Sequence, residues 1–316
     1  MFLIHLQYCI QQRIIIIKKV IILFLFFIFS LSFVHPYLTL TSPIPNVNTT
    51  TILDSSAASP FKFRIGTALL IRTVSCGIGL GPHWAIVVVQ ASILFALMMS
   101  MLLIANWDPI PALLLFVGLV VSHITGGFIG TMSKWAPPQH LYDLGAILAT
   151  TLGLLVLQYK IKEPAYFLLV VFLFSFNKET VIWLLPIAFI LWLKEFGGLR
   201  ALFWTSLSIF ICIVVRLLII HFQGEGSMVI NHLSENWYIL TTPHRAIRLF
   251  LLGGGLWIGL FYFHIKEWIV IASMVAFIGI QGVFGVIDEL RIYGEIMPIL
   301  AIGTARLIQT KVTSYS

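Results

Sequence analysis

The sequence predicts an all-α fold, a polytopic bundle of about ten transmembrane helices (roughly 9–11) in a single transmembrane domain over residues 1–316. Hydrophobic residues make up 59% of the chain and charged residues only 10%, against about 25% charged in ordinary soluble domains. The mean hydropathy is +1.02. The apolar residues also come in long blocks, which excludes a soluble domain, a disordered chain, a coiled coil and a secreted disulfide scaffold.

A membrane-spanning helix needs about 20 mostly apolar residues. Blocks of this kind give the expected spans 20–35, 84–104, 109–130, 141–158, 165–176, 181–193, 201–221, 247–264, 268–286 and 294–309. Arg13, Lys18 and Lys19 precede the first block, as basic residues also precede the apolar core of a cleaved signal peptide. We expect a retained first helix, because the apolar run is long and no small-residue cleavage site directly follows it.

The fifth and sixth blocks are short and flank the polar tetrapeptide Asn177-Lys178-Glu179-Thr180. One helix over 165–193 would be about 43 Å long at about 1.5 Å per residue, which exceeds the bilayer core. We therefore expect two half-length helices that meet at a polar break. Such breaks occur in membranes where protein buries them or where they line a watery cavity.

Short basic loops favour the cytoplasmic side of a membrane. With ten spans and the N-terminus inside, four basic sites become cytoplasmic: Lys160/Lys162, Lys194/Arg200, Lys266 and Lys311. The chain is then a multi-pass protein of the plasma (cytoplasmic) membrane with both termini in the cytoplasm. The net charge of +7 is explained by topology and by membrane lipids with anionic headgroups, so no nucleic-acid partner is expected.

Two long segments, 36–83 and 222–246, face outward in this arrangement. Residues 36–83 form the first extracytoplasmic loop, which we expect to be extended over 36–60 and to carry an interfacial helix over 62–75. No separate soluble domain is expected.

Charges near apolar segments on the outer side are expensive to bury unless they pair or face water. Arg64 is suited to bidentate contact with a phosphate, or alternatively to anchoring at lipid headgroups. Asp143 opens a span, where it is either a helix cap or a functional carboxylate. The tetrapeptide 177–180 either faces a cavity or forms a self-neutralising turn at the surface.

The fourth cluster precedes the final span and contains Asp288, Glu289, Arg291 and Glu295. On a helix Arg291 and Glu295 would share a face, so a structural salt bridge explains these two alone. This salt bridge explains less well why an acidic cluster lies at the start of the final span. The cysteines and histidines show no ligand spacing, so no metal ligands are predicted.

At these clusters the sequence resembles a group of uncharacterised bacterial multi-pass membrane proteins that are similar to the GT-C superfamily of polyprenyl-phosphate-sugar-dependent glycosyltransferases. The resemblance spans roughly residues 60–300 and rests on four short elements taken in order. They are Phe63-Arg64, Tyr142-Asp143, Asn177-Lys178-Glu179-Thr180 and Glu289-x-Arg291-x-x-x-Glu295-x-x-Pro298.

The resemblance implies a GT-C-like bundle, a polyprenyl-phosphate-sugar donor and inverting transfer at the extracytoplasmic face. It implies that a carboxylate of the first outer loop acts as catalytic base or metal ligand. Asp54 fits this role by its position in the loop, and Asp143 fits it by its position at a helix end. The resemblance also implies that lipid phosphate and substrate are bound by residues of the remaining elements, namely Arg64, Lys178, Glu179, Glu289, Arg291 and Glu295. The resemblance specifies no cofactor, and a divalent metal is compatible with it.

A non-catalytic alternative is a transporter, a flippase-like protein or a scaffold subunit of envelope polysaccharide assembly. A broken helix with intramembrane charges suits a transporter equally well. The first outer loop carries a single acidic residue, Asp54, and no acidic pair, which leaves this alternative open.

Overall fold

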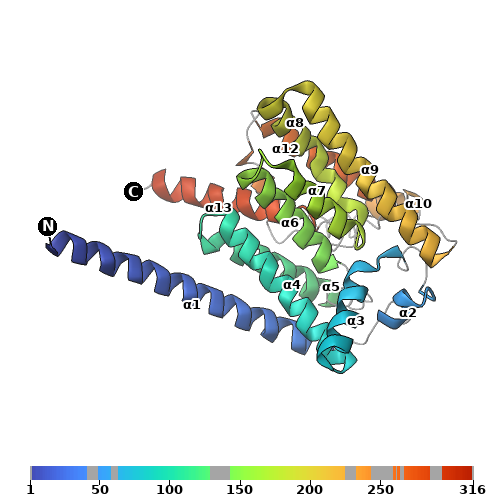
Figure 1. The fold of residues 1–316 in the computed structure, drawn as a ribbon, viewed down its shortest axis with the longest axis horizontal. Coiled ribbons are helices and arrows are strands. Elements are labelled where there is room, and N and C mark those ends of the chain that lie inside the picture. The colour runs from blue at the N-terminus through green and yellow to red at the C-terminus, as the bar shows by residue number, and fades with distance from the viewer. Residues whose placement is uncertain are drawn as a thin grey trace.

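A computed structural model describes residues 2–40, 49–57, 63–128, 143–224, 233–242, 259–260, 262–263, 267–284 and 294–314. Within these ranges the secondary structure is entirely helical, as predicted (Figure 1). The elements are α1 Phe2–Leu40, α2 Thr49–Leu53, α3 Gly66–Ile78, α4 Pro82–Ile104, α5 Pro109–Phe128, α6 Asp143–Tyr159, α7 Pro164–Ser175, the 3-10 helix η4 Glu179–Leu184, α8 Leu185–Phe196, α9 Gly198–Gln223, α10 Leu233–Thr241, α12 Trp268–Phe284 and α13 Met297–Ser314.

In the described part of the chain, three helices are long and apolar enough to cross a membrane: Ile15–Pro36 within α1, Pro82–Ile104 and Gly198–Gln223. Five shorter helical segments are also apolar: Gly66–Ile78, Pro109–Leu119, Asp143–Tyr159, Pro164–Ser175 and Trp268–Ile280. The chain is therefore a helical membrane protein. Of the expected span 247–264, all but residues 259, 260, 262 and 263 lie outside the described residues.

Helix α1 departs from prediction at its end. It runs through Pro36 to Leu40, so the expectation of an extended loop from residue 36 is wrong for residues 36–40. It is also wrong for 49–53, which form α2. A proline removes one backbone hydrogen bond of a helix, but the helix can continue beyond it with a kink. Residues 41–48 of the expected loop lie outside the described part of the chain.

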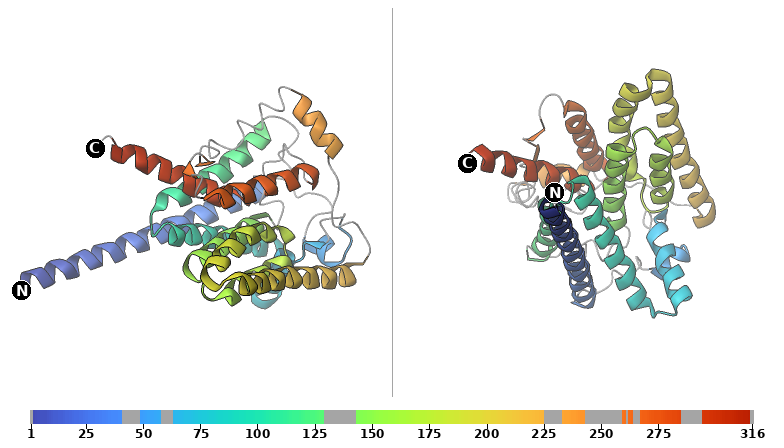
Figure 2. Two further views of the ribbon diagram at one scale, coloured as in Figure 1. Left: turned by 90° about the horizontal axis from the view of Figure 1, so that it is seen from above. Right: turned by 60° about the vertical axis from the view of Figure 1, so that its left-hand side comes forward.

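The N-terminal half of α1 projects from the bundle, and its C-terminal half packs beside α4 (Figures 1 and 2). Aromatic contacts join α1 to α4 and to α5: the ring centroids of Phe27 and Phe95 are 5.9 Å apart, and those of Phe33 and Phe116 are 5.6 Å apart. Only 11% of the residues in the most apolar stretch of α1 are buried within the protein. Most of this surface is therefore suited to contact with lipid tails.

The chain turns back on itself between α7 and α8. Helix α7 ends at Ser175 and η4 begins at Glu179, so the predicted break at the polar tetrapeptide is confirmed. At the far ends of these segments, Lys162 Nζ lies 3.4 Å from Glu195 Oε1. A continuous helix would hold these two groups about 50 Å apart at about 1.5 Å per residue. The single-helix alternative is wrong.

The turn after α4, near the C-terminal end of α6, holds several helices together. Helix α4 closes with the hydrogen-bond pattern of a Schellman motif, since Trp107 N donates to Leu102 O (2.6 Å) and Asn106 N to Leu103 O (3.1 Å). Asn106 adopts the left-handed conformation that this motif needs, with φ 51°. Neighbouring elements contact the same turn through Tyr159 on Asn106, Gln309 on Asp108 and Lys19 over the Trp107 ring.

This turn and the Lys162–Glu195 pair lie at the end of α6 that carries Tyr159, and the opposite end of α6 begins at Asp143. Between the two ends, the core contains fully buried side chains of α4, α7 and α8. Among them Phe167 and Trp192 pack edge to face with ring centroids 5.4 Å apart. Both chain ends lie on the same side of the molecule (Figures 1 and 2).

Candidate functional site

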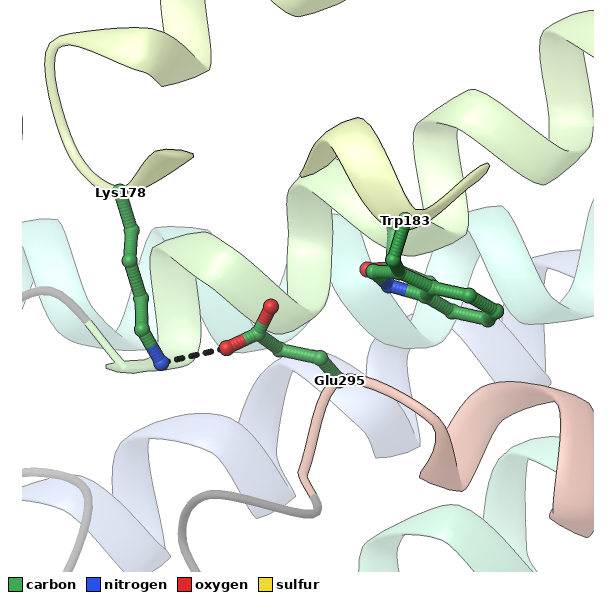
Figure 3. Close-up of polar contacts among 4 residues, drawn as sticks. Lys178, Trp183 and Glu295 are labelled. Atoms are coloured by element: carbon green, nitrogen blue, oxygen red, sulfur yellow. Dashed lines mark hydrogen bonds and ion pairs between the residues drawn. The ribbon is translucent and has the colours of Figure 1, made fainter. Parts of the chain in front are cut away.

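A buried ion pair joins the break between α7 and η4 to the turn that precedes α13. Lys178 Nζ lies 2.5 Å from Glu295 Oε1, and the two side chains are only 7% and 1% exposed. Figure 3 shows the two side chains pointing toward one another from different elements, with Trp183 of η4 nearby. Burying two charges costs several kcal/mol per ion unless they pair closely, as these do.

Backbone geometry at the break places Lys178. The residue has an extended conformation (φ −158°, ψ 138°) between α7 and η4, so its side chain leaves the helical path. Lys178 is buried and pairs with Glu295. The alternative of a self-neutralising surface turn is therefore wrong for Lys178.

The start of α3 anchors the same break. Gly66 N donates to Phe176 O (2.8 Å), and Asn177 Oδ1 accepts bonds from Thr67 Oγ1 (2.6 Å) and Thr67 N (3.3 Å). Asn177 and Thr67 are both buried, with 3% and 4% exposure. The polar break is thus bound to the segment that follows Arg64.

Helix α6 approaches the break closely at Gly145. A Cβ atom added at Gly145 would lie 2.7 Å from Asn177 Nδ2 and 3.3 Å from Thr67 Oγ1. Real side chains do not make contacts as short as the first of these. Gly145, two residues after Asp143, therefore permits α6 to lie against Asn177.

Asp143 is the first residue of α6 and is 3% exposed. Its charge is felt at Glu295, so the two carboxyl groups lie within electrostatic range of one another. We call Asp143, Asn177, Lys178 and Glu295 the polar cluster. It brings together residues from three elements that are distant in sequence, and it lies at the end of α6 opposite Tyr159.

Arg216, which was not predicted as a site residue, lies on α9 and is 8% exposed. Its Nη1 donates to Phe63 O (3.0 Å) and to Ser175 O (3.1 Å). Ser175 ends α7, where carbonyl groups lack helical partners and the helix dipole favours a positive charge. Arg216 therefore links the segment before Arg64 to the helix before Lys178. It is the one Asp, Glu, Lys or Arg in the expected span 201–221, which was the available signal.

The remaining predicted residues have different outcomes. Arg64 is half-buried, between Phe63, whose carbonyl binds Arg216, and the α3 residues that bind the break. The backbone of Glu179 begins η4, while its side chain falls outside the description. Glu289 and Arg291 also lie outside the described residues.

Asp54 lies outside the buried cluster, in an exposed turn after α2. Its Oδ1 accepts bonds from the hydroxyl (2.5 Å) and the backbone N–H (3.0 Å) of Ser56. These two bonds hold the pKa of the Asp54 carboxyl below its usual value. A lower pKa makes the Asp54 carboxylate a weaker base.

Glu295 also differs from its expected setting. Residues 294–296 form a turn, and the first residues of α13 include Pro298, so Glu295 does not lie on a regular helix face. The described partner of Glu295 is Lys178, from a distant element, and the expected pair with Arg291 lies outside the described residues.

A divalent metal does not fit the described part of the cluster. Within the described residues no three His, Cys, Asp or Glu side chains gather in metal-binding positions. The Lys178 ammonium also occupies Glu295 Oε1, where it would repel a cation.

Comparisons of this chain with protein-family models, with curated proteins and with solved structures found no match.

Proposed function

We propose that this chain is a multi-pass membrane protein of about ten spans that acts as a GT-C-like glycosyltransferase, transferring a sugar from a polyprenyl phosphate at the extracytoplasmic face. One observation carries the proposal. The Lys178–Glu295 pair joins two of the sequence elements on which the resemblance rests, and Asp143 brings in a third. Elements that meet in space support a shared site more strongly than elements that merely follow one another in sequence.

The first element is connected to the same place. Arg216 and Asn177 tie the residues on both sides of Arg64 to the α7–η4 break. Arg64 is the basic group that we assign to the phosphate, because it is half-buried beside these residues and its planar guanidinium can make bidentate contacts. Arg291, which also belongs to this proposal, would add a second positive charge.

The transfer step follows from these assignments. Asp143 accepts the proton of an acceptor hydroxyl while the hydroxyl oxygen forms a bond to the anomeric carbon of the sugar. The bond between that carbon and the phosphate oxygen breaks, and the lipid phosphate leaves with the electron pair. Arg64 offsets the charge that develops on the phosphate. A single displacement of this kind inverts the anomeric configuration.

The proposed orientation places both termini and the Lys162–Glu195 pair in the cytoplasm of a cell whose plasma membrane holds the protein. The polar cluster then lies toward the outer face. This arrangement agrees with the positive-inside rule, because the basic residues of short loops gather at the Tyr159 end of α6.

The test is sugar transfer in reconstituted vesicles. Purified protein would be mixed with a labelled polyprenyl-phosphate sugar, and the anomeric configuration of the product would be determined by NMR. The proposal predicts transfer with inversion. Donor that is bound but never consumed, across several sugars and acceptors, would refute catalysis.

A non-catalytic transporter or flippase-like role is the second candidate, and one observation favours it. Two half-length segments, α7 and η4–α8, meet at a break that contains a neutralised charge pair. Discontinuous helices with buried charges are common at transport sites. Movement of a fluorescent polyprenyl-phosphate lipid between leaflets, without chemical change, would distinguish this role.

A further inference from the structure

Three large apolar side chains of α10 face away from the protein. Leu233, Trp237 and Leu240 are 56%, 68% and 52% exposed, whereas Asn236 and Ile239 are buried. The three exposed residues are spaced four and three apart, so they share one face of the helix. We call them the apolar side of α10. A contiguous exposed apolar face of this kind marks contact with an apolar partner.

The helix has two further sides. With 3.6 residues per turn, the buried residues Asn236 and Ile239 lie about a quarter turn from the apolar side. The remainder of the circumference carries Ser234, Glu235 and Thr241, which are all exposed and which we call the polar side. A helix at a membrane surface has this arrangement, with one side on the protein, one in the lipid tails and one in water.

The length and direction of α10 also fit a membrane surface. Nine residues make a helix about 14 Å long, far short of the hydrocarbon core of about 30 Å. The helix, drawn in orange, runs obliquely to α9 and α12 (Figure 2, left). It lies at the end of the molecule where α9 ends (Figures 1 and 2), which is the outer end in the proposed orientation.

The apolar side adjoins another exposed apolar surface. Helix α10 packs against α12, on which Val275 and Ile280 are 62% and 55% exposed. In a membrane protein such side chains contact lipid tails. Tryptophan and tyrosine are common at the boundary between lipid and water, and α10 exposes Trp237 together with Tyr238.

We propose that α10 is an interfacial helix that inserts its apolar side among the lipid acyl chains at the membrane surface. The partner is the bilayer itself. The attraction is apolar rather than electrostatic, because α10 contains no Lys or Arg. This inference goes beyond the proposed function and does not depend on sugar transfer.

The test is site-directed spin labelling of the whole chain, from which Cys9, Cys76 and Cys212 have been removed, in phosphatidylcholine nanodiscs that hold one copy each. Single cysteine replacements would place a nitroxide at each position of the apolar and polar sides. All these side chains are exposed, so the labels do not disturb packing. Accessibility would be measured to molecular oxygen, which dissolves in lipid, and to a neutral nickel chelate, which stays in water.

The ratio of oxygen to nickel accessibility should vary along α10 with a period of about 3.6 residues and be highest on the apolar side. Labels on this side should lie about 5–10 Å below the lipid phosphates. Labels on the polar side should respond to the nickel chelate instead.

Two positions calibrate the scale. Val275→Cys should report contact with lipid, and Lys162→Cys, at a side chain that is 77% exposed, should report contact with water. Sodium chloride at about 1 M, which shortens the screening length to about 3 Å, should leave the ratios on α10 unchanged.

Three outcomes would overturn the inference. Labels on the apolar side that are as accessible to nickel as the label at Lys162→Cys would place this side in water. Labels shielded from both reagents would show that protein, rather than lipid, covers it. Loss of the pattern in concentrated salt would show that the attachment is electrostatic.

Discussion

Lys178 and Glu295 join the α7–η4 break to the turn before α13 through a 2.5 Å contact that is almost wholly removed from solvent. Lys178→Met should therefore lower the free energy of unfolding by about 3–5 kcal/mol, because it leaves a buried carboxylate without its counter-charge. The double variant Lys178→Met/Glu295→Met should recover much of this loss. Thermal unfolding in detergent measures both.

The matched control is the exposed pair Lys160–Glu163, with 2.8 Å between the charged atoms and side chains 49% exposed. Lys160→Met should cost no more than about 1 kcal/mol. Equal losses for the Lys160 and Lys178 variants would contradict the account of a tightly coupled buried pair.

The Lys162–Glu195 contact makes a prediction about topology. Cysteines at residues 162 and 195, in a chain from which Cys9, Cys76 and Cys212 have been removed, should react with a membrane-impermeant maleimide from the same side. A short bismaleimide should join them. If the two positions were labelled from opposite sides, the return at the polar break would be wrong.

Gly145 tests the close approach of α6 to the break. An alanine here would place its Cβ 2.7 Å from Asn177 Nδ2, so we expect a loss of about 1–3 kcal/mol from overpacking. Gly279, in α12, has no atom within 4 Å of its ideal Cβ position. Gly279→Ala should therefore be neutral or stabilise by up to about 1 kcal/mol. Unfolding midpoints that fall equally in both variants would show that packing at Gly145 is not the cause.

Arg216 tests the link between α9 and two chain segments. Arg216→Met removes charged hydrogen bonds to Phe63 O and Ser175 O, and we expect a loss of at least about 2 kcal/mol. It should also expose the α7–η4 turn to limited proteolysis. Arg72→Met, at an exposed position of α3, serves as the control and should change neither readout. An Arg216 variant as stable as the Arg72 variant would contradict the link.

Some of this structure follows from the sequence and some does not. The helical class and the break at 177–180 follow from block length and from the high cost of burying polar residues in apolar segments. The partner of Lys178 does not, because a pair between distant elements depends on how helices pack rather than on local spacing. Arg216 could have been suspected as a lone charge in an apolar block, but its two carbonyl partners come from tertiary structure.

At the end of the first helix, the sequence predicts a loop where the structure has a helix. Pro36 and the polar residues after it favour a loop, yet α1 continues to Leu40. Local preferences are weak there compared with the packing of α1 beside α4, where His35 stacks on Trp84 with ring centroids 5.1 Å apart.

The most direct test of the polar cluster as a catalytic site compares Asp143→Asn with Asp54→Asn in reconstituted vesicles, by initial rates of sugar transfer from a polyprenyl-phosphate donor. Asp143 is buried within electrostatic range of Glu295, whereas Asp54 is exposed and bound to Ser56. The account predicts that Asp143→Asn lowers kcat by about 100-fold or more and that Asp54→Asn retains the wild-type rate. Full transfer by the Asp143 variant, or loss of transfer only in the Asp54 variant, would contradict it.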